Sequence, residues 1–375
     1  MANIIDYMDW RGDILMKHSA LNEVDGLIFS QFAYVPFDGL IENGFKEYRT
    51  IEELGKHFFE VHPQEEIDTW TELLKSSCSV LRKMIEVPRF KDLRVFNYCS
   101  EFEPEISKQF AAITIEIDRN TLYVAFRGTD DSLAGWEEDF KACYMMPVAA
   151  QQRASEYLKE IFEKTTAKVY LGGHSKGGNL AVYAAMKEGS HNKKRVIRVQ
   201  NYDGPGFLQE FVESPEYKKM MPLTDNYNPR ASIVGLIMFR GDDYTVVESS
   251  EKGLMQHTGI SWQVFGNHFV KADGFDKFCL VFSKANKTWI NEIEQEKREM
   301  FIEIVFGILK DGFDTVTGLK DGFFSTAASI IKSYNGVDKD TRRMARKILG
   351  QVIRLSTASY KETKKEQKIL IEKSK

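Results

Sequence analysis

The spacing of hydrophobic and polar residues changes twice along the chain, and the first part of it is helical in pattern. Apolar residues dominate 24–34, a capping-box-like start occurs at 50–54, and an amphipathic stretch runs over 69–84. These features predict a helical segment over residues 1–90. We expect it to pack against the main domain or to cover its site.

From about residue 91 the pattern changes to short apolar runs typical of β-strands. The predicted strands are 93–98, 111–117, 121–126, 168–172, 196–200 and 233–239. A turn at 118–120 predicts a hairpin, and helical stretches at 151–163 and 179–186 separate later strands. Strands that alternate with helices pair in parallel, so residues 91–283 are predicted to form a three-layer α/β domain with a mostly parallel sheet. Its ligand site should lie at the carboxyl ends of the strands.

The last part, residues 284–375, is again predicted to be helical. Trp289, Ile293, Met300 and Ile304 fall on one helical face, a pattern that favours docking on a core. Beyond residue 338 the sequence is rich in lysine. A solvated helix end is the favoured interpretation of this tail, and contact with an anionic membrane surface is the alternative.

Composition narrows the class of protein. The chain has 375 residues, of which 43% are hydrophobic, enough for a buried core, and its net charge of −4 does not indicate a nucleic-acid partner. Cys78, Cys99, Cys143 and Cys279 are widely spaced and are predicted to be buried, reduced thiols. The start lacks a signal-peptide pattern, and no stretch reaches the roughly 18 apolar residues of a membrane span. We therefore expect a cytoplasmic protein. As a separate expectation, its chemistry needs neither metal nor cofactor.

The main chemical signal is a G-x-S-x-G sequence at 173–177, between a predicted strand and a predicted helix. This is the context of a nucleophile elbow, which makes Ser175 the candidate nucleophile. The backbone N–H of Lys176, at the start of the following helix, is then a candidate oxyanion donor. The alternative is a glycine-rich turn with an exposed serine.

A serine nucleophile needs a base, and histidine is the usual one. Of the histidines beyond residue 100, His174 lies inside the elbow and should point away from the serine Oγ, and His191 lies in a polar run. His257 and His268 remain. We favour His257, in a loop after the last apolar strands, against the alternative of a surface-loop histidine.

In α/β-hydrolases the acid lies between the serine and the histidine in the sequence. Asp203 follows strand 196–200 and precedes a Gly-Pro-Gly turn, which places it at the edge of the sheet where Ser175 lies. Asp242 is the alternative acid, although its Gly-Asp-Asp sequence is equally a plain turn, and Asp203 could itself be a turn stabiliser. Thr129, in the loop after strand 121–126, is the second candidate oxyanion donor.

Taken together, these motifs resemble the class 3 (fungal-type) lipases and, more closely, a bacterial branch of α/β-hydrolase-like proteins of unassigned function. The lipase-like residues are Phe126-Arg127-Gly128-Thr129, Trp136, Asp139, Gly173-His174-Ser175-Lys176-Gly177-Gly178 and His257. The residues shared with the bacterial branch are Asp6-Tyr7, Trp10, Asn22-Glu23-Val24-Asp25, Asp203-Gly204-Pro205-Gly206, Gln256-His257 and Ser261-Trp262. The resemblance covers roughly residues 1–280.

The resemblance implies an α/β-hydrolase fold, with Ser175 as nucleophile, His257 as base, and Thr129 and Lys176 as oxyanion donors. It also implies a lid over 130–150. Two positions depart from the lipase pattern. Lys176 stands where leucine is usual, and the segment 232–235 (Ser-Ile-Val-Gly) lacks the aspartate of the lipase acid. Either Asp203 or Asp242 supplies the acid instead, or the site is degenerate; we favour Asp203.

The sequence therefore predicts a serine hydrolase that cleaves carboxylic esters of acyl or lipid-like substrates through an acyl-enzyme. A thioesterase or an acyltransferase would use the same residues. A non-catalytic binding module that keeps the fold is the remaining alternative.

Overall fold

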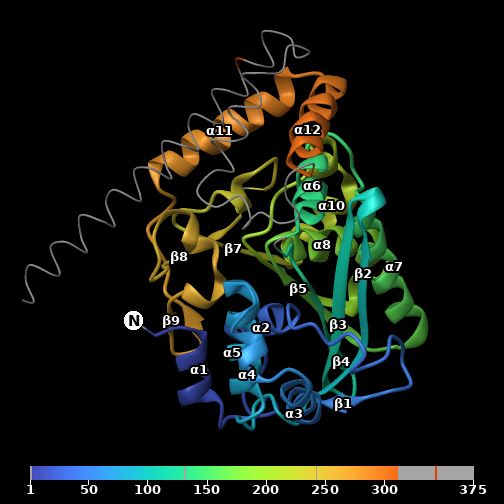
Figure 1. The fold of residues 1–375 in the computed structure, drawn as a ribbon, viewed down its shortest axis with the longest axis vertical. Helices are drawn as coiled ribbons and strands as arrows, with labels where there is room; N and C mark the ends of the chain where they lie inside the picture. The colour runs from blue at the N-terminus through green and yellow to red at the C-terminus, as the bar shows by residue number, and fades with distance from the viewer. Residues whose placement is uncertain (1, 131, 242, 311–342, 344–375) are drawn as a thin grey trace, which may run out of the picture.

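A mixed eight-stranded sheet forms the centre of the computed structural model, which describes residues 2–130, 132–241, 243–310 and 343 (Figure 1). The strands are β1 (Arg49–Thr50), β2 (Arg94–Glu103), β3 (Lys108–Asp118), β4 (Thr121–Phe126), β5 (Lys168–His174), β6 (Val196–Tyr202), β7 (Thr224–Pro229) and β8 (Thr245–Val247). Their order in the sheet is their order in the sequence. Strands β1 to β4 pair antiparallel, and β4 to β8 pair in parallel. A separate hairpin joins β9 (Val264–Phe265) to β10 (His268–Phe269).

Five of the six strands predicted from the sequence are confirmed, as is the hairpin between β3 and β4. The predicted strand over 233–239 is wrong, because this run contains a 3₁₀ turn, Val234–Leu236, and Phe239 forms an isolated bridge with Phe207. Its apolar side chains are buried by packing in a loop rather than in a ladder; Leu236 and Met238 are both buried. Strand β7 takes this place in the sheet. Its sequence is mostly polar, so the apolar pattern does not predict it.

Helices cover both faces of the sheet. They are α1 (Ile4–Arg11), α2 (Glu23–Phe32), α3 (Ile51–Val61), α4 (Gln64–Ile67), α5 (Glu72–Met84), α6 (Leu133–Lys141), α7 (Ala149–Lys164), α8 (Lys176–Ala184), α9 (Gln209–Glu213), α10 (Pro215–Met220), α11 (Lys277–Glu292) and α12 (Gln295–Lys310). The helices predicted in the first part of the chain and at 151–163 and 179–186 are confirmed. The predicted capping box is also present, between Thr50 and Glu53.

Alternate residues of the central strands feed two separate cores, as the pleat of a sheet requires. Ile113, Tyr123 and Ala125 pack with α1, α2, α3 and α5 on one face. Val124 and Phe126 pack with α7 and α8 on the other. A third apolar cluster joins α6 to α11 and α12. These helices lie at one end of the sheet (Figure 1).

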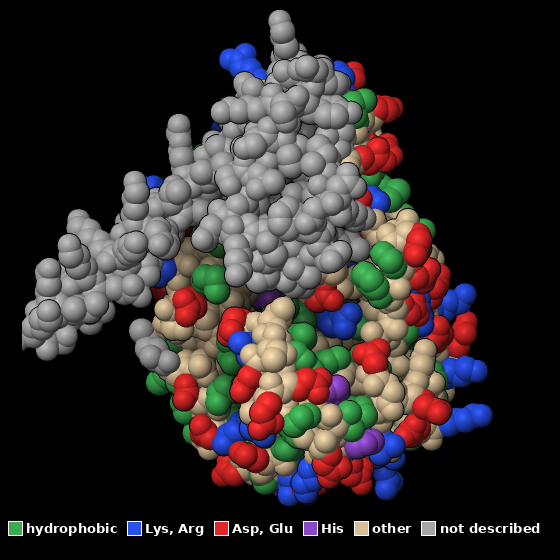
Figure 2. Space-filling model, in the orientation of Figure 1, with side chains coloured by type: hydrophobic (Ala, Val, Ile, Leu, Met, Phe, Trp, Pro, Cys, Tyr) green, Lys and Arg blue, Asp and Glu red, His purple; other side chains and the backbone are tan. Residues whose placement is uncertain are grey.

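These layers, a mostly parallel sheet and a tight strand–turn–helix at Ser175 make the architecture an α/β-hydrolase fold. The four cysteines are free and buried. Acidic and basic side chains are interspersed across the described part of the face in Figure 2. Within the described ranges, every helix is too short or too polar to cross a bilayer. Asp242 and the lysine-rich tail beyond residue 338, apart from Arg343, lie outside the described residues.

Candidate active site

Ser175 lies on a strained turn between β5 and α8. Its backbone has φ 58° and ψ −133°, a region that residues with a side chain rarely occupy. The turn is tight because glycines flank it: a Cβ on Gly173 would overlap the backbone of Gly177, and a Cβ on Gly177 would overlap the Phe126 carbonyl. Strain of this kind costs about 1–3 kcal/mol and raises the serine out of the sheet.

Ser175 is partly buried and directly precedes the first turn of α8. Ser175 is the N-cap of this helix but makes no capping bond with its side chain, so the first backbone N–H groups of α8 are not satisfied by it. Among the described residues, Ser175 Oγ has no hydrogen-bond partner, so no such bond joins it to His257, the candidate base. Of the first N–H groups of α8, that of Gly178 donates to the Ser175 carbonyl over 2.9 Å, and that of Lys176 stays the candidate oxyanion donor.

Asp203 leaves the sheet beside Ser175, because the residues before them, Tyr202 and His174, are paired in neighbouring parallel strands. The Ser175 N–H donates to the Tyr202 carbonyl over 2.9 Å. A Cβ built on Gly204 would lie 2.7 Å from the Ser175 carbonyl oxygen, which shows how closely the two chain segments approach. Adjacent strand ends thus bring the candidate nucleophile and the candidate acid together.

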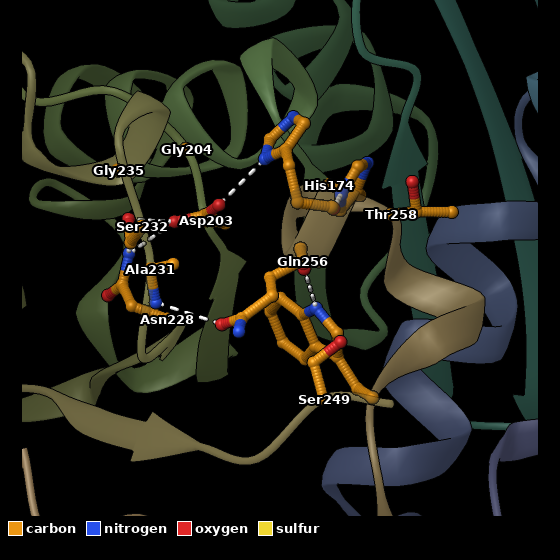
Figure 3. A network of polar contacts seen from close by, with 12 residues as sticks. His174, Asp203, Gly204, Asn228, Ala231, Ser232, Gly235, Ser249, Gln256 and Thr258 are labelled. Carbon is orange, nitrogen blue, oxygen red and sulfur yellow. Dashed lines mark hydrogen bonds and ion pairs between the residues drawn. The ribbon is translucent and has the colours of Figure 1, made fainter. Parts of the chain in front are cut away.

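The Asp203 carboxylate is completely buried and accepts three hydrogen bonds (Figure 3). Oδ2 accepts from His257 Nδ1 over 2.6 Å. Oδ1 accepts from Asn228 Nδ2 over 2.7 Å and from Ser232 Oγ over 2.5 Å. These donors stabilise a carboxylate that burial alone would destabilise.

His257 is the last residue of a 3₁₀ turn, Gly253–His257, and its neighbour Gln256 anchors this turn on two sides. Gln256 accepts a bond from the Ala231 N–H through its side chain and one from Trp262 Nε1 through its carbonyl, each over 2.9 Å. Because His257 Nδ1 donates to Asp203, the neutral ring carries its lone pair on Nε2. The ring is partly exposed, with 27% of the side chain accessible.

His174 fixes the same loop from inside the sheet, a role that the sequence did not indicate. Its Nε2 donates to the His257 carbonyl over 2.7 Å, and its Nδ1 accepts from the Tyr34 hydroxyl over 3.1 Å. Burial lowers the pKa of His174 to about 3, with the nearby His257 ring adding to the effect, so His174 is neutral near pH 7. Tyr34 follows α2, so the helical N-terminal segment reaches the candidate site through this bond.

The other histidine candidates lie elsewhere. His268, on β10, is exposed and faces Glu23, with 3.6 Å between Nδ1 and Oε1. His191 is exposed in a turn before β6. Of the two histidines weighed as base, only His257 lies against a buried carboxylate.

Ser232 occupies the position at which the lipase pattern predicts the acid, and it donates its hydroxyl to Asp203 instead. Asn228 is fixed in turn by Arg240, whose Nη2 donates to Asn228 Oδ1 and whose Nη1 donates to the Gly235 carbonyl over 2.5 Å. The segment that lacks the lipase aspartate therefore still supports a carboxylate, which now comes from the neighbouring strand β6.

Thr129 and Lys176, the candidate oxyanion donors, are both tied to α6 through their side chains. The Thr129 hydroxyl donates to Asp139 Oδ2, and the Lys176 ammonium donates to Glu138 Oε2. The Thr129 hydroxyl is therefore already used, and its N–H remains as the candidate donor. Burial raises the pKa of Asp139 to about 6.

Helix α6 lies within the segment for which the resemblance implies a lid, and its acidic side chains bond to other parts of the domain. Besides the bonds of Glu138 and Asp139, the neighbouring Glu137 accepts a hydrogen bond from Ser107 Oγ, directly before the start of β3. Three consecutive carboxylates of α6 thus each hold a different part of the domain.

A cavity of about 490 Å³ lies between the 144–146 loop, residues 208–210 and the α11–α12 turn. Its walls include Tyr144, Met145, Ile290 and Arg298, but neither Ser175 nor His257. In the described ranges, no three His, Cys, Asp or Glu side chains are grouped closely enough to hold a metal ion.

Three solved structures are similar to this chain at low identity. A mutant form of MDLA from Penicillium cyclopium is 10% identical, with a TM-score of 0.38 over 66% of this chain and 84% of that one. A fungal lipase is 11% identical, with a TM-score of 0.38 over 67% and 85% of the two chains. The Rhizomucor miehei lipase, in its propeptide complex, is 14% identical, with a TM-score of 0.33 over 67% and 94%.

No curated protein sequence matches the chain. The model of one family, described as Mbeg1-like, matches residues 84–307. This match runs from the end of α5 to α12 and includes Ser175, Asp203 and His257. Because it spans more than half of the sequence, the chain belongs to the Mbeg1-like family.

Proposed function

We propose that this protein is a serine hydrolase that cleaves carboxylic esters through an acyl-enzyme. The observation that carries the proposal is the 2.6 Å bond between His257 Nδ1 and the fully buried Asp203 carboxylate, next to a serine on a strained elbow. A histidine oriented by a buried carboxylate beside a strand–turn–helix serine is the arrangement that acyl transfer uses on many folds.

In the proposed reaction, Ser175 Oγ attacks the ester carbonyl carbon while His257 Nε2 takes the hydroxyl proton. The resulting oxyanion accepts hydrogen bonds from the N–H groups of Lys176 and Thr129. The imidazolium then protonates the leaving alkoxide, and the C–O bond breaks to give the alcohol and an acyl-serine. A water molecule, deprotonated by His257, attacks the acyl-serine, and the acid and the free serine are released.

Asp203 has two tasks in this scheme. Its bond to His257 Nδ1 selects the tautomer whose Nε2 can accept the serine proton, and its charge stabilises the imidazolium that forms. Ser175 Oγ and His257 Nε2 must approach within hydrogen-bond distance for the first step. Contacts of this kind commonly tighten when substrate binds.

The test is covalent labelling of Ser175 by a fluorophosphonate probe near pH 7.5, located by peptide mass spectrometry. We expect labelling in the unmodified protein and none in Ser175→Ala. A matched control is Ser79→Ala, because Ser79 is an exposed serine on α5 whose hydroxyl donates to the Lys75 carbonyl of the same helix. Absence of labelling at Ser175 in folded protein would reject the hydrolase and leave the binding module.

A panel of p-nitrophenyl esters and acyl thioesters of graded chain length then defines the substrate. Ester and thioester cleavage share the acyl-enzyme and differ in the leaving group. The ratio of kcat/KM values between matched esters and thioesters therefore separates an esterase from a thioesterase.

A further inference from the structure

The two candidate oxyanion residues come from distant parts of the sequence but are held by neighbouring side chains of one helix. Glu138 of α6 pairs with Lys176, and Asp139 pairs with Thr129. Lys176 directly follows the elbow serine, and Thr129 follows β4. One turn of α6 thus connects both places from which an N–H would reach the oxyanion.

The Glu138–Lys176 pair is buried, with 2% of the Glu138 side chain and 4% of the Lys176 side chain accessible. Both side chains of the pair also make further hydrogen bonds to the backbone. Glu138 accepts from the Gln109 N–H over 3.1 Å and from the Ala150 N–H over 2.7 Å, and Lys176 Nζ donates to the Gln109 carbonyl over 3.0 Å. The pair therefore joins the starts of β3, α7 and α8 to α6.

A buried ion pair of this kind contributes little to stability, because desolvation offsets most of the attraction. A leucine, usual at this position in the resembled lipases, would fill the same space without that cost. The directional bonds of such a pair have another effect, because they fix the positions of the two residues that carry the charges.

We infer that the Glu138–Lys176 pair is a positioning device for the oxyanion hole, an inference that rests on the proposed hydrolase function. Lys176 carries the N–H donor on the same residue as the ammonium, so fixing Nζ fixes the first turn of α8. An oxyanion donor must lie about 2.7–3.1 Å from the developing charge. Movement of α6 away from the sheet would release Lys176 and Thr129 together, so a closed α6 is a condition for catalysis.

The test is a double-mutant cycle of Glu138→Gln and Lys176→Met. The measured quantities are kcat and KM of ester hydrolysis in the steady state. Each kcat is divided by the fraction of protein that a fluorophosphonate labels when the labelling is complete. Loss of one whole oxyanion donor lowers kcat by about 10²–10³-fold. For a displaced donor we expect each single variant to lose roughly 10–100-fold in kcat with KM within about twofold. The double variant should lose no more than the worse single variant, because both changes break one contact.

The matched control is Asp25→Asn in the Asp25–Arg89 pair, whose two side chains are fully buried on the α2 side of the sheet. It removes a buried carboxylate in the same way but touches neither oxyanion residue. We expect Asp25→Asn to lower Tm while kcat per labelled site stays within about twofold of wild type. If Asp25→Asn does not fold, Glu101→Gln serves, since Glu101 pairs with Arg153 and Lys108.

Three results would overturn the inference. In the first, the single variants lower Tm but keep kcat. In the second, their losses in kcat multiply in the double variant. In the third, the control variant loses as much kcat as Glu138→Gln. If the wild-type protein is not labelled at all, the proposed hydrolase function fails instead, and the two failures are distinguishable.

Discussion

Replacing Asp203 by asparagine removes the charge at the centre of the candidate site without changing its volume. Three donors point at this side chain, from His257, Asn228 and Ser232. An asparagine offers one oxygen and one NH₂ group, so at least one of the three present donors must become an acceptor or lose its bond. Which one it is decides the size of the effect.

The surrounding bonds decide the orientation. Arg240 can only donate, and it donates to Asn228 Oδ1, which turns the Asn228 NH₂ towards residue 203. The oxygen of the new asparagine must therefore face Asn228, and its NH₂ faces His257 Nδ1. The imidazole then presents its lone pair at Nδ1 and its proton at Nε2, the tautomer that cannot deprotonate Ser175.

We expect Asp203→Asn to lower kcat by about 10⁴-fold, as a wrong tautomer does in other serine hydrolases. This corresponds to about 5.5 kcal/mol of transition-state stabilisation, at 1.36 kcal/mol per decade. The measurement is p-nitrophenyl ester hydrolysis near pH 7.5, with circular dichroism to verify the fold. Ser232→Ala is the control, because it removes one donor but leaves the tautomer, so its loss should stay within about tenfold. An Asp203→Asn activity within tenfold of wild type would refute the reasoning.

Three further outcomes are expected. Moving the carboxylate with Asp203→Ser and Ser232→Asp should restore at least roughly tenfold more ester hydrolysis than Asp203→Ser alone, because the two side chains meet at 2.5 Å; equal activities would contradict this. Burial lowers the pKa of His174 to about 3 in the folded protein, whereas in the unfolded chain His174 binds a proton below about pH 6.5. The free energy of unfolding therefore decreases as pH falls from 6.5 towards 3. Between pH 7 and pH 4, the free energy of unfolding measured in urea should therefore fall less for His174→Gln than for the wild type. An equal fall in the two proteins would contradict this prediction. Ser175→Gly should raise the free energy of unfolding by about 1–2 kcal/mol, since glycine relieves the strained φ of 58°. Ser175→Ala should not raise it. Equal Tm values for the two variants would argue against strain.

The sequence alone predicted the elements that depend on local chemistry. The strand–turn–helix at Ser175 could be recognised because a tight elbow requires small residues at fixed spacing, and no distant contact is needed to see it. The hairpin between β3 and β4 and the capped start of α3 follow from equally local signals. The failure over 233–239 has the opposite cause: an apolar run shows that side chains must be buried, and a buried loop satisfies that need as well as a strand does.

Only the tertiary structure decided which polar groups meet. Asn228 carries no mark in the sequence, and Ser232 is marked there only as the position of a missing aspartate. Both reach Asp203, because parallel strands bring their carboxyl ends to one edge. The contact of His174 with His257, and that of Glu138 with Lys176, join segments 83 and 38 residues apart in the sequence. Sequence spacing sets local backbone geometry, whereas hydrogen bonds over such separations depend on how the layers pack, and that packing is a property of the whole chain.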